Sequence, residues 1–184
     1  MNIPNKLTIL RIIAVPALVA AHYFCVSAIP AVLLFIFASV TDWLDGYTAR
    51  ATNQVTPLGA FLDPVADKLL VVTALGLLMS TKPDVILTIS GIVVIARELF
   101  ISSLREWMAV MSADCRIEVS RIAKMKTGLQ MTALILLIYA SKSASPIWDA
   151  GVSLLVVSIL FSLYSALNYL KTAWPALTFG SKQQ

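Results

Sequence analysis

Long apolar runs follow one another along this chain and leave few stretches that water could solvate. Hydrophobic residues make up 59% of the 184 residues, and charged residues only 13%. A soluble domain usually carries about 25% charged residues, so this chain is short of polar surface. Several of the runs approach the roughly 20 residues that a helix needs to cross a bilayer. The sequence therefore predicts an all-α polytopic membrane protein with a single transmembrane domain over residues 1–184.

The apolar runs are separated by turn signals, which divide the chain into six expected transmembrane helices. Thr56-Pro57 is typical of an N-cap followed by proline at the first helical position. The stretch 81–85 and Ser145-Pro146 favour turns. We expect the helices at roughly 7–26, 29–50, 58–79, 85–108, 121–140 and 150–171.

Basic residues are distributed unevenly among the expected loops. The chain has fourteen Lys and Arg residues. Only Lys82 and Lys142 fall in the connections after the first, third and fifth helices, whereas the other twelve lie toward the opposite side. Because loops rich in Lys and Arg stay in the cytoplasm, we expect both termini on the cytoplasmic side.

The stretch from Ser39 to Leu70 holds four of the ten acidic residues of this apolar chain, which are Asp42, Asp45, Asp63 and Asp67. An ionised Asp at the centre of a membrane helix costs about 2.5–3.5 kcal/mol. These residues fall near the cytoplasmic ends of two helices, where the cost is lower. The cluster still requires water, partners or a bound cation.

Helical spacing predicts that the four carboxylates face one another. Asp42 and Asp45 are separated by three residues, and Asp63 and Asp67 by four, so each pair shares one helical face. The short connection 51–56 makes the two helices antiparallel neighbours. An all-oxygen site of this kind suits Mg²⁺ or Mn²⁺ rather than zinc. Two divalent ions are expected, because one would leave the cluster negative.

Residues beside the acids favour a phosphate-containing ligand. Gly46 and Gly59 leave the helix surfaces bare, so a ligand can approach the backbone closely. Arg50 follows Asp42 on the edge of the same face and is placed to meet an anion that the metal ions also hold.

Simpler roles exist for single members of the cluster. Asp63 precedes Pro64 and could cap a helix, and Asp45 precedes Gly46 and could belong to a turn. These alternatives explain one residue at a time, whereas the shared spacing of the whole set favours a binding site.

The spacing also resembles a known family signature. From Asp42 to Asp67 the chain reads Asp-x2-Asp-Gly-x2-Ala-Arg-x8-Gly-x3-Asp-x3-Asp, which is similar to the complete motif of the CDP-alcohol phosphatidyltransferases. The resemblance implies a six-helix enzyme of the bacterial inner membrane, usually a homodimer, with a two-metal site at the cytoplasmic face. Such enzymes transfer a phosphatidyl group from CDP-diacylglycerol to an alcohol and release CMP.

The resemblance also implies roles for individual residues. Asp67, the last in the motif, is expected to be the general base. Metal ligands are expected at Asp42, Asp45, Asp63 and Asp67. The CDP-diacylglycerol site is expected to include Asp42, Gly46, Ala49, Arg50 and Gly59.

Flanking segments resemble the family members that use sn-glycerol 3-phosphate as the acceptor. They are the opening segment with Asn5, Thr8 and Arg11, the segments 95–108 and 123–131, and the ending "LYSALNYL". A phosphorylated acceptor needs cations beyond Arg50. The candidates are Arg11, Arg97, Arg105, Lys124 and Lys126. Basic residues at cytoplasmic helix ends are also expected from topology alone, although Arg97 lies well inside an apolar run beside Glu98.

Other acceptors and one other class of function remain open at this point. The same chemistry could act on inositol phosphate, serine or phosphatidylglycerol, and cations near the fifth helix favour a phosphorylated acceptor over serine. A small cation transporter would also place acids in a membrane. Transporters usually contain internal repeats and midplane sites, whereas this chain has no evident repeat and its acids lie toward one side.

Overall fold

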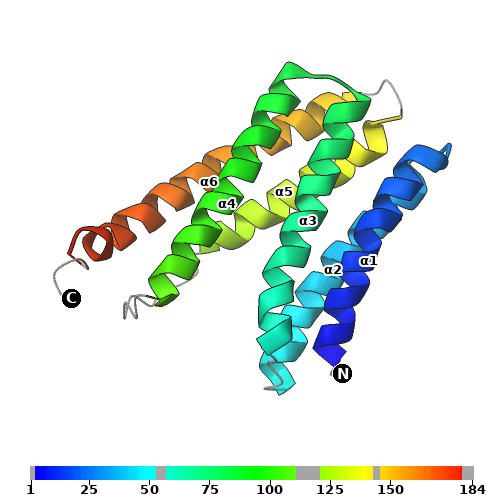
Figure 1. Cartoon of the computed structure of the whole chain (residues 1–184). Helices are drawn as coiled ribbons and strands as arrows, with labels where there is room; N and C mark the ends of the chain where they lie inside the picture. Colours follow the sequence, from blue (N-terminus) through cyan, green and yellow to red (C-terminus); the bar gives the residue numbers. More distant parts are fainter. Residues whose placement is uncertain (1–2, 53–56, 111–120, 143–145, 180–184) are drawn as a thin grey trace.

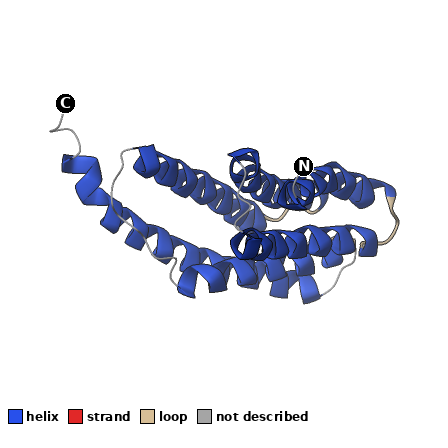
Figure 2. Cartoon of the chain, turned by 90° about the horizontal axis from the view of Figure 1, so that it is seen from below, coloured by secondary structure: helices blue, strands red, loops and turns tan. Residues whose placement is uncertain are grey.

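The computed structural model describes residues 3–52, 57–110, 121–142 and 146–179, and Figure 1 draws the other residues as a thin grey trace. Within these ranges the side chains of 3–7, 43–52, 57–58, 60, 109–110, 121–124, 172–173 and 175–179 are not described. The described segments form six helices, which are α1 (Ile3–Phe24), α2 (Ile29–Thr52), α3 (Pro57–Thr81), α4 (Val85–Val110), α5 (Arg121–Ala140) and α6 (Pro146–Phe179). The prediction of an all-α chain is confirmed, and Figure 2 shows that every described secondary-structure element is a helix.

Helix boundaries follow the sequence signals at several ends. Helix α3 begins at Pro57, and α5 begins at Arg121, both as predicted. Helix α6 begins at Pro146 rather than near 150, and it continues to Phe179 rather than 171. Proline fits the first helical turn because its missing N–H is one that the helix does not use, so Pro146 starts α6 instead of ending a turn before it.

The helices are arranged as two groups that share a core (Figure 1). Helix α1 packs against both α2 and α3, and α6 packs against α4 and α5. Contacts of α2 with α5, and of α3 with α4 and α5, join the two groups. The most deeply buried large side chains include one from each of the six helices and form one apolar cluster: Leu18, Phe35, Leu75, Leu87, Leu134 and Leu155. Close packing of α5 on α6 depends on Gly151, where a Cβ would lie 2.8 Å from Leu137 Cγ.

Polar contacts close the end of the molecule where α1, α3 and α5 finish. His22 hydrogen-bonds Thr81 (2.7 Å), and Tyr23 hydrogen-bonds Ser80 (3.0 Å). Asp84 caps α4 by accepting from the backbone N–H of Leu87 (3.1 Å). That bond and a second from the indole N–H of Trp148 hold the pKa of Asp84 below its ordinary value. These contacts join the end of α1 to the end of α3, and the start of α4 to the first turn of α6.

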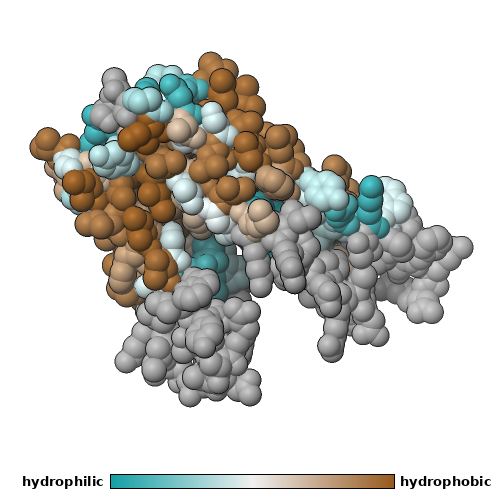
Figure 3. All heavy atoms as spheres, turned by 180° about the vertical axis from the view of Figure 1, so that it is seen from behind, coloured by the Kyte–Doolittle hydropathy of each residue, from teal (hydrophilic) through white to brown (hydrophobic). Residues whose placement is uncertain are grey.

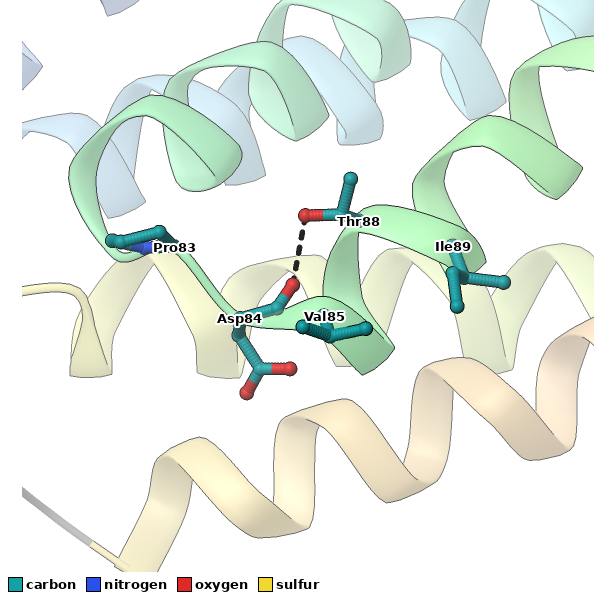
Figure 4. A pocket seen from close by; sticks show the side chains of 5 residues that line it. All are labelled: Pro83, Asp84, Val85, Thr88 and Ile89. Atoms are coloured by element: carbon teal, nitrogen blue, oxygen red, sulfur yellow. Dashed lines mark hydrogen bonds between the residues drawn. The ribbon is translucent and has the colours of Figure 1, made fainter.

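An open pocket lies at this same end, beside the connection between α3 and α4. Figure 4 shows its lining residues, which are Pro83, Asp84, Val85, Thr88 and Ile89. The Thr88 hydroxyl donates to the Asp84 carbonyl (2.8 Å) and so belongs to the first turn of α4. The pocket is at the opposite end of α3 from Asp63 and Asp67 and has no part in the acidic stretch.

Large apolar side chains cover much of the outer surface (Figure 3). Phe24 is 87% exposed and Val26 is 97% exposed, which would be unfavourable in water over so wide an area. Two helical stretches in the described residues are long and apolar enough to cross a membrane, Val85–Met108 and Pro146–Lys171. Shorter apolar helices run over Thr8–Phe24, Ile29–Asp42 and Met125–Ala140. The surface is therefore suited to a membrane environment.

Candidate active site

The first turns of α1 direct two polar side chains toward the acidic residues of α2 and α3. Thr8 and Arg11 are three residues apart and therefore share one helical face, and both are buried. The Thr8 hydroxyl donates a hydrogen bond to Asp63 Oδ1 (2.5 Å). Helix α1 thus fixes the position of a carboxylate that belongs to a neighbouring helix.

Arg11 lies between two other carboxylates. Its Nη1 atom is 3.0 Å from Asp42 Oδ1 on α2 and 2.5 Å from Asp67 Oδ1 on α3. One nitrogen therefore contacts both acids, and the two carboxylate oxygens can be no farther apart than the sum of these distances. The prediction that the acidic faces of the two helices meet is supported by this geometry. We call Asp42, Asp63 and Asp67, with Thr8 and Arg11, the acidic cluster.

Exposure differs sharply within the acidic cluster. The Arg11 side chain is 0% exposed, whereas the side chains of Asp42 and Asp67 are each 42% exposed. The guanidinium therefore lies beneath the carboxylates, and the carboxylates are accessible from the outside. A ligand that arrives from solvent reaches oxygen atoms rather than Arg11.

The donor set of the acidic cluster fits a hard divalent cation. Asp42 and Asp67 already converge on one positive charge, that of Arg11, and carboxylate oxygens are ligands that Mg²⁺ accepts. Among the described side chains, no three acidic, His or Cys residues are grouped closely enough to form a metal site by themselves. The side chain of Asp45 is outside the described part of the chain, so the complete ligand set stays a prediction.

Several predicted site residues have a described backbone position only. Helix α2 contains Asp45, Gly46, Ala49 and Arg50, and α5 contains Lys124, but the side chains of all five lie outside the described residues. Gly59 lies in the first turns of α3 and is buried.

The single-residue alternatives for two of the acids are wrong. Asp45 and Gly46 lie inside α2, which continues to Thr52, so they form no turn. Asp63 and Pro64 lie inside α3, which begins at Pro57, so Asp63 does not cap the start of that helix. Both acids are placed on helical faces, as the spacing requires.

A second group of charged residues joins α4 to α5. Glu98 Oε1 accepts hydrogen bonds from Arg97 Nη1 (2.9 Å) and from Lys126 Nζ (2.6 Å). The side chains of both cations are nearly buried, at 11% and 6% exposure, and that of Glu98 is 31% exposed. We call Arg97, Glu98 and Lys126 the basic cluster. It brings together two of the five cations that the sequence suggested for the acceptor.

The other two described candidates lie elsewhere. Arg105 is two turns beyond Arg97 on α4 and stacks over the ring of Tyr169 on α6, 5.5 Å from its centroid. Arg11 belongs to the acidic cluster, on α1.

A contact between α3 and α4 relates the two clusters. Lys68 Nζ donates to Ser102 Oγ. Lys68 follows Asp67 directly, and Ser102 is one helical turn after Glu98. The acidic and basic clusters therefore lie at the same level of adjacent helices.

Four residues of this arrangement were missing from the predicted site. The sequence pattern indicates Thr8 only as part of the opening segment and Glu98 only as the neighbour of Arg97, and it does not single out Lys68 or Ser102. The spacing of Thr8 and Arg11 on one face of an apolar helix is a signal that could have identified the first of them. Nothing in the local sequence identifies the contact of Lys68 with Ser102, because it joins different helices.

The family model for the CDP-alcohol phosphatidyltransferases matches residues 1–174 of this chain. The chain belongs to this family. The match includes both clusters and all six described helices, apart from the end of α6.

Relatives in this family align with the chain over nearly its whole length. The protein of Pseudomonas fluorescens is 43% identical, and the alignment covers 100% of this chain and 96% of that protein. Those of Haemophilus influenzae and Escherichia coli are each 44% identical, over 94% of this chain and 93–94% of theirs. Each of the three is named CDP-diacylglycerol–glycerol-3-phosphate 3-phosphatidyltransferase.

Proposed function

We propose that this phosphatidyltransferase moves a phosphatidyl group from CDP-diacylglycerol to sn-glycerol 3-phosphate, giving phosphatidylglycerophosphate and CMP. The observation that carries the proposal is that full-length relatives at 43–44% identity are named for this reaction. The two clusters add a physical reason, because the reaction brings together a pyrophosphate and a phosphorylated alcohol. An acidic site for cations beside a basic site for an anion serves both.

Asp42, Asp45, Asp63 and Asp67 would hold two Mg²⁺ ions, or Mn²⁺ as the alternative. When bound, these ions would supply positive charge that stabilises the pyrophosphate and the leaving CMP. Arg11 and Thr8 fix three of the carboxylates by direct contact. Transfer at phosphorus depends mostly on position and charge, so this fixed geometry is the protein's main contribution.

Asp67 would accept the proton of the attacking hydroxyl, as a general base. Its partly exposed carboxylate has one oxygen held by Arg11, which restricts the direction of the group. Gly46, Ala49, Arg50 and Gly59 would line the site for the cytidine diphosphate, with Arg50 on a phosphate.

The basic cluster is the best-supported binding site for the glycerol phosphate. Arg97 and Lys126 together carry two positive charges, and Glu98 carries one negative charge. The basic cluster therefore has a net positive charge that would attract a phosphate. Lys124 is two residues before Lys126 on α5, and Arg105 is two turns after Arg97 on α4. Both residues would add positive charge near the basic cluster and so strengthen its attraction for the anion.

The enzyme would work in the bacterial inner membrane as a homodimer, with six membrane-crossing helices. The exposed apolar side chains and the apolar stretches of α4 and α6 support the membrane setting. The twelve basic residues on one side support an orientation with both termini and the active site toward the cytoplasm.

The test uses the purified protein in detergent with CDP-diacylglycerol, Mg²⁺ and one alcohol at a time, with CMP release as the readout. The alcohols are sn-glycerol 3-phosphate, inositol phosphate, serine and phosphatidylglycerol. We expect CMP with glycerol 3-phosphate and none above background with the others. Release with a different alcohol alone would overturn only the choice of acceptor, whereas no release with any of them would overturn the proposed chemistry.

A further inference from the structure

We propose that Arg11 is a built-in counter-cation of the divalent-metal site. In this role it holds Asp42 and Asp67 at one centre, offsets part of their negative charge, and does not bind the acceptor phosphate. The inference deepens the proposed function and rests on it in one respect, namely that divalent ions bind at the acidic cluster.

The Arg11 side chain is buried beneath the carboxylates of Asp42 and Asp67. Its side chain is 0% exposed, while those of Asp42 and Asp67 are 42% exposed. The next residues on its face of α1, Ala14 and Leu18, are buried and apolar. A guanidinium that left the two acids would become a buried charge among apolar side chains, which is strongly unfavourable. Arg11 therefore stays in position when other ligands bind.

The same position separates Arg11 from the cations of the basic cluster. A phosphate that approaches from solvent meets the two negative carboxylates before it could reach the guanidinium. Arg97 and Lys126 contact a single carboxylate on α4, whereas Arg11 contacts two on different helices. An anion is thus attracted to the basic cluster and repelled from the surface above Arg11.

Charge then determines how strongly the site binds a cation. A divalent ion bound by Asp42 and Asp67 would be repelled by a positive charge held within a few ångströms. At the intermediate dielectric constant typical of sites near a protein surface, unit charges about 4 Å apart interact strongly enough to change an affinity more than about tenfold. Removal of the Arg11 charge should therefore tighten divalent-ion binding at least about tenfold, although the carboxylates would lose the contact that aligns them.

The experiment measures Mn²⁺ binding to the EDTA-stripped protein in detergent, by the electron paramagnetic resonance signal of free Mn²⁺. Arg11→Gln should lower the dissociation constant at least about tenfold, and Arg11→Lys, which keeps the charge, should change it less than about threefold. Lys82→Gln is the matched control, because it removes a positive charge at the other end of the molecule. It should leave the Mn²⁺ affinity unchanged.

Thermal unfolding of the same proteins gives a second readout. Arg11→Gln in EDTA should unfold at a lower temperature than the wild type, because Asp42 and Asp67 then repel each other without a counter-ion. Saturating Mg²⁺ should raise its unfolding temperature more than that of the wild type, since a ligand stabilises the state that binds it in proportion to the logarithm of its affinity. If Arg11→Gln is too unstable to purify in EDTA, it should still be obtained folded in Mg²⁺.

The outcomes separate this inference from the proposed function. Wild-type protein that binds no Mn²⁺ would overturn the metal part of the proposed function, and this inference with it. If the wild-type protein binds Mn²⁺ and Arg11→Gln binds it with the same or a weaker affinity, only the proposed role of Arg11 is overturned. Arg11 would then be a structural ion-pair partner of the two acids. Failure of Arg11→Gln to fold even in saturating Mg²⁺, while Arg11→Lys folds, would also overturn it.

Discussion

The acidic and basic clusters are built on the same plan with opposite signs. In the acidic cluster, one buried cation, Arg11, contacts carboxylates from α2 and α3. In the basic cluster, one carboxylate, Glu98, contacts cations from α4 and α5. Each cluster thus has a central residue whose charge is opposite to that of its other charged members, and we call it the minority residue. Arg11 joins α1 to α2 and α3, whereas Glu98 joins α4 to α5.

The difference between the clusters lies in which charge is buried. Arg11, the minority residue of the acidic cluster, is fully buried, and its acids are half exposed. Glu98, the minority residue of the basic cluster, is more exposed than either of its cations. The acidic cluster therefore presents its surplus negative charge to the outside, whereas the basic cluster keeps its surplus positive charge largely buried. A cation can reach the first directly, but an anion has to displace or share Glu98 in the second.

The largest effect is expected in the acidic cluster, from Asp67→Asn. The change removes the proposed base and one carboxylate beside Arg11, so turnover should fall at least about 100-fold. The protein should stay folded, because an amide of the same shape remains. CMP release and thermal unfolding measure the two effects.

Asp84→Asn is the control for that substitution, since it makes the same chemical change at the other end of α3. It should weaken the cap of α4 and leave turnover within about threefold of the wild type. Substantial activity in Asp67→Asn would rule out Asp67 as the base.

The next largest effect is expected in the basic cluster, from Lys126→Ala. A charged hydrogen bond contributes about 1.5–3 kcal/mol, which corresponds to a loss of roughly ten- to a hundredfold in affinity for the acceptor. The KM for glycerol 3-phosphate should therefore rise, while the KM for CDP-diacylglycerol should change little. Initial rates at varied concentrations of each substrate measure both values.

Lys142→Ala serves as the control for the basic cluster, because Lys142 contacts the Cys25 carbonyl at the opposite end. It should alter neither KM. If Lys126→Ala raises the two KM values equally, the basic cluster is not the acceptor site.

Removal of the minority residue of the basic cluster should have a smaller effect. Glu98→Gln leaves Arg97 and Lys126 nearly buried without their carboxylate, and we expect a loss of about 2 kcal/mol in the free energy of unfolding, because Glu98 is partly exposed. Inorganic phosphate should restore stability in this variant more than in the wild type. Thermal unfolding with and without phosphate measures the difference.

Glu106→Gln provides the comparison for this prediction, because Glu106 is an exposed acid two turns farther along α4. It should change stability by less than about 0.5 kcal/mol, and phosphate should have no special effect on it. Equal stabilisation of Glu98→Gln and the wild type by phosphate would contradict an anion site in the basic cluster.

The sequence predicts which residues share one helical face better than it predicts which residues on other helices contact them. The intervals between Asp42 and Asp67 were enough to predict that two acidic faces meet, since periodicity fixes which residues share a face of a helix. The same intervals contain no information on a third helix, so Arg11 was grouped with cations for the acceptor instead of with the acids. Glu98 was likewise visible only as a neighbour of Arg97, because its bond to Lys126 joins positions 28 residues apart. Long-range partners of this kind depend on how helices pack, which a single sequence does not specify.

The smallest effect is expected at the contact that relates the two clusters. Ser102→Ala removes the acceptor of the Lys68 hydrogen bond. Because the Lys68 side chain is partly exposed and can bind water instead, we expect this bond to contribute only about 1 kcal/mol, less than a buried charged hydrogen bond. Stability should fall by about that amount, and both KM values should stay within about twofold, because neither cluster loses a charged group. Ser103→Ala, at the exposed neighbouring position on α4, should leave stability unchanged. A selective rise in the KM for glycerol 3-phosphate in Ser102→Ala would instead mean that the Lys68 contact sets the distance between the clusters, so that their alignment, and not only their charge, limits the transfer.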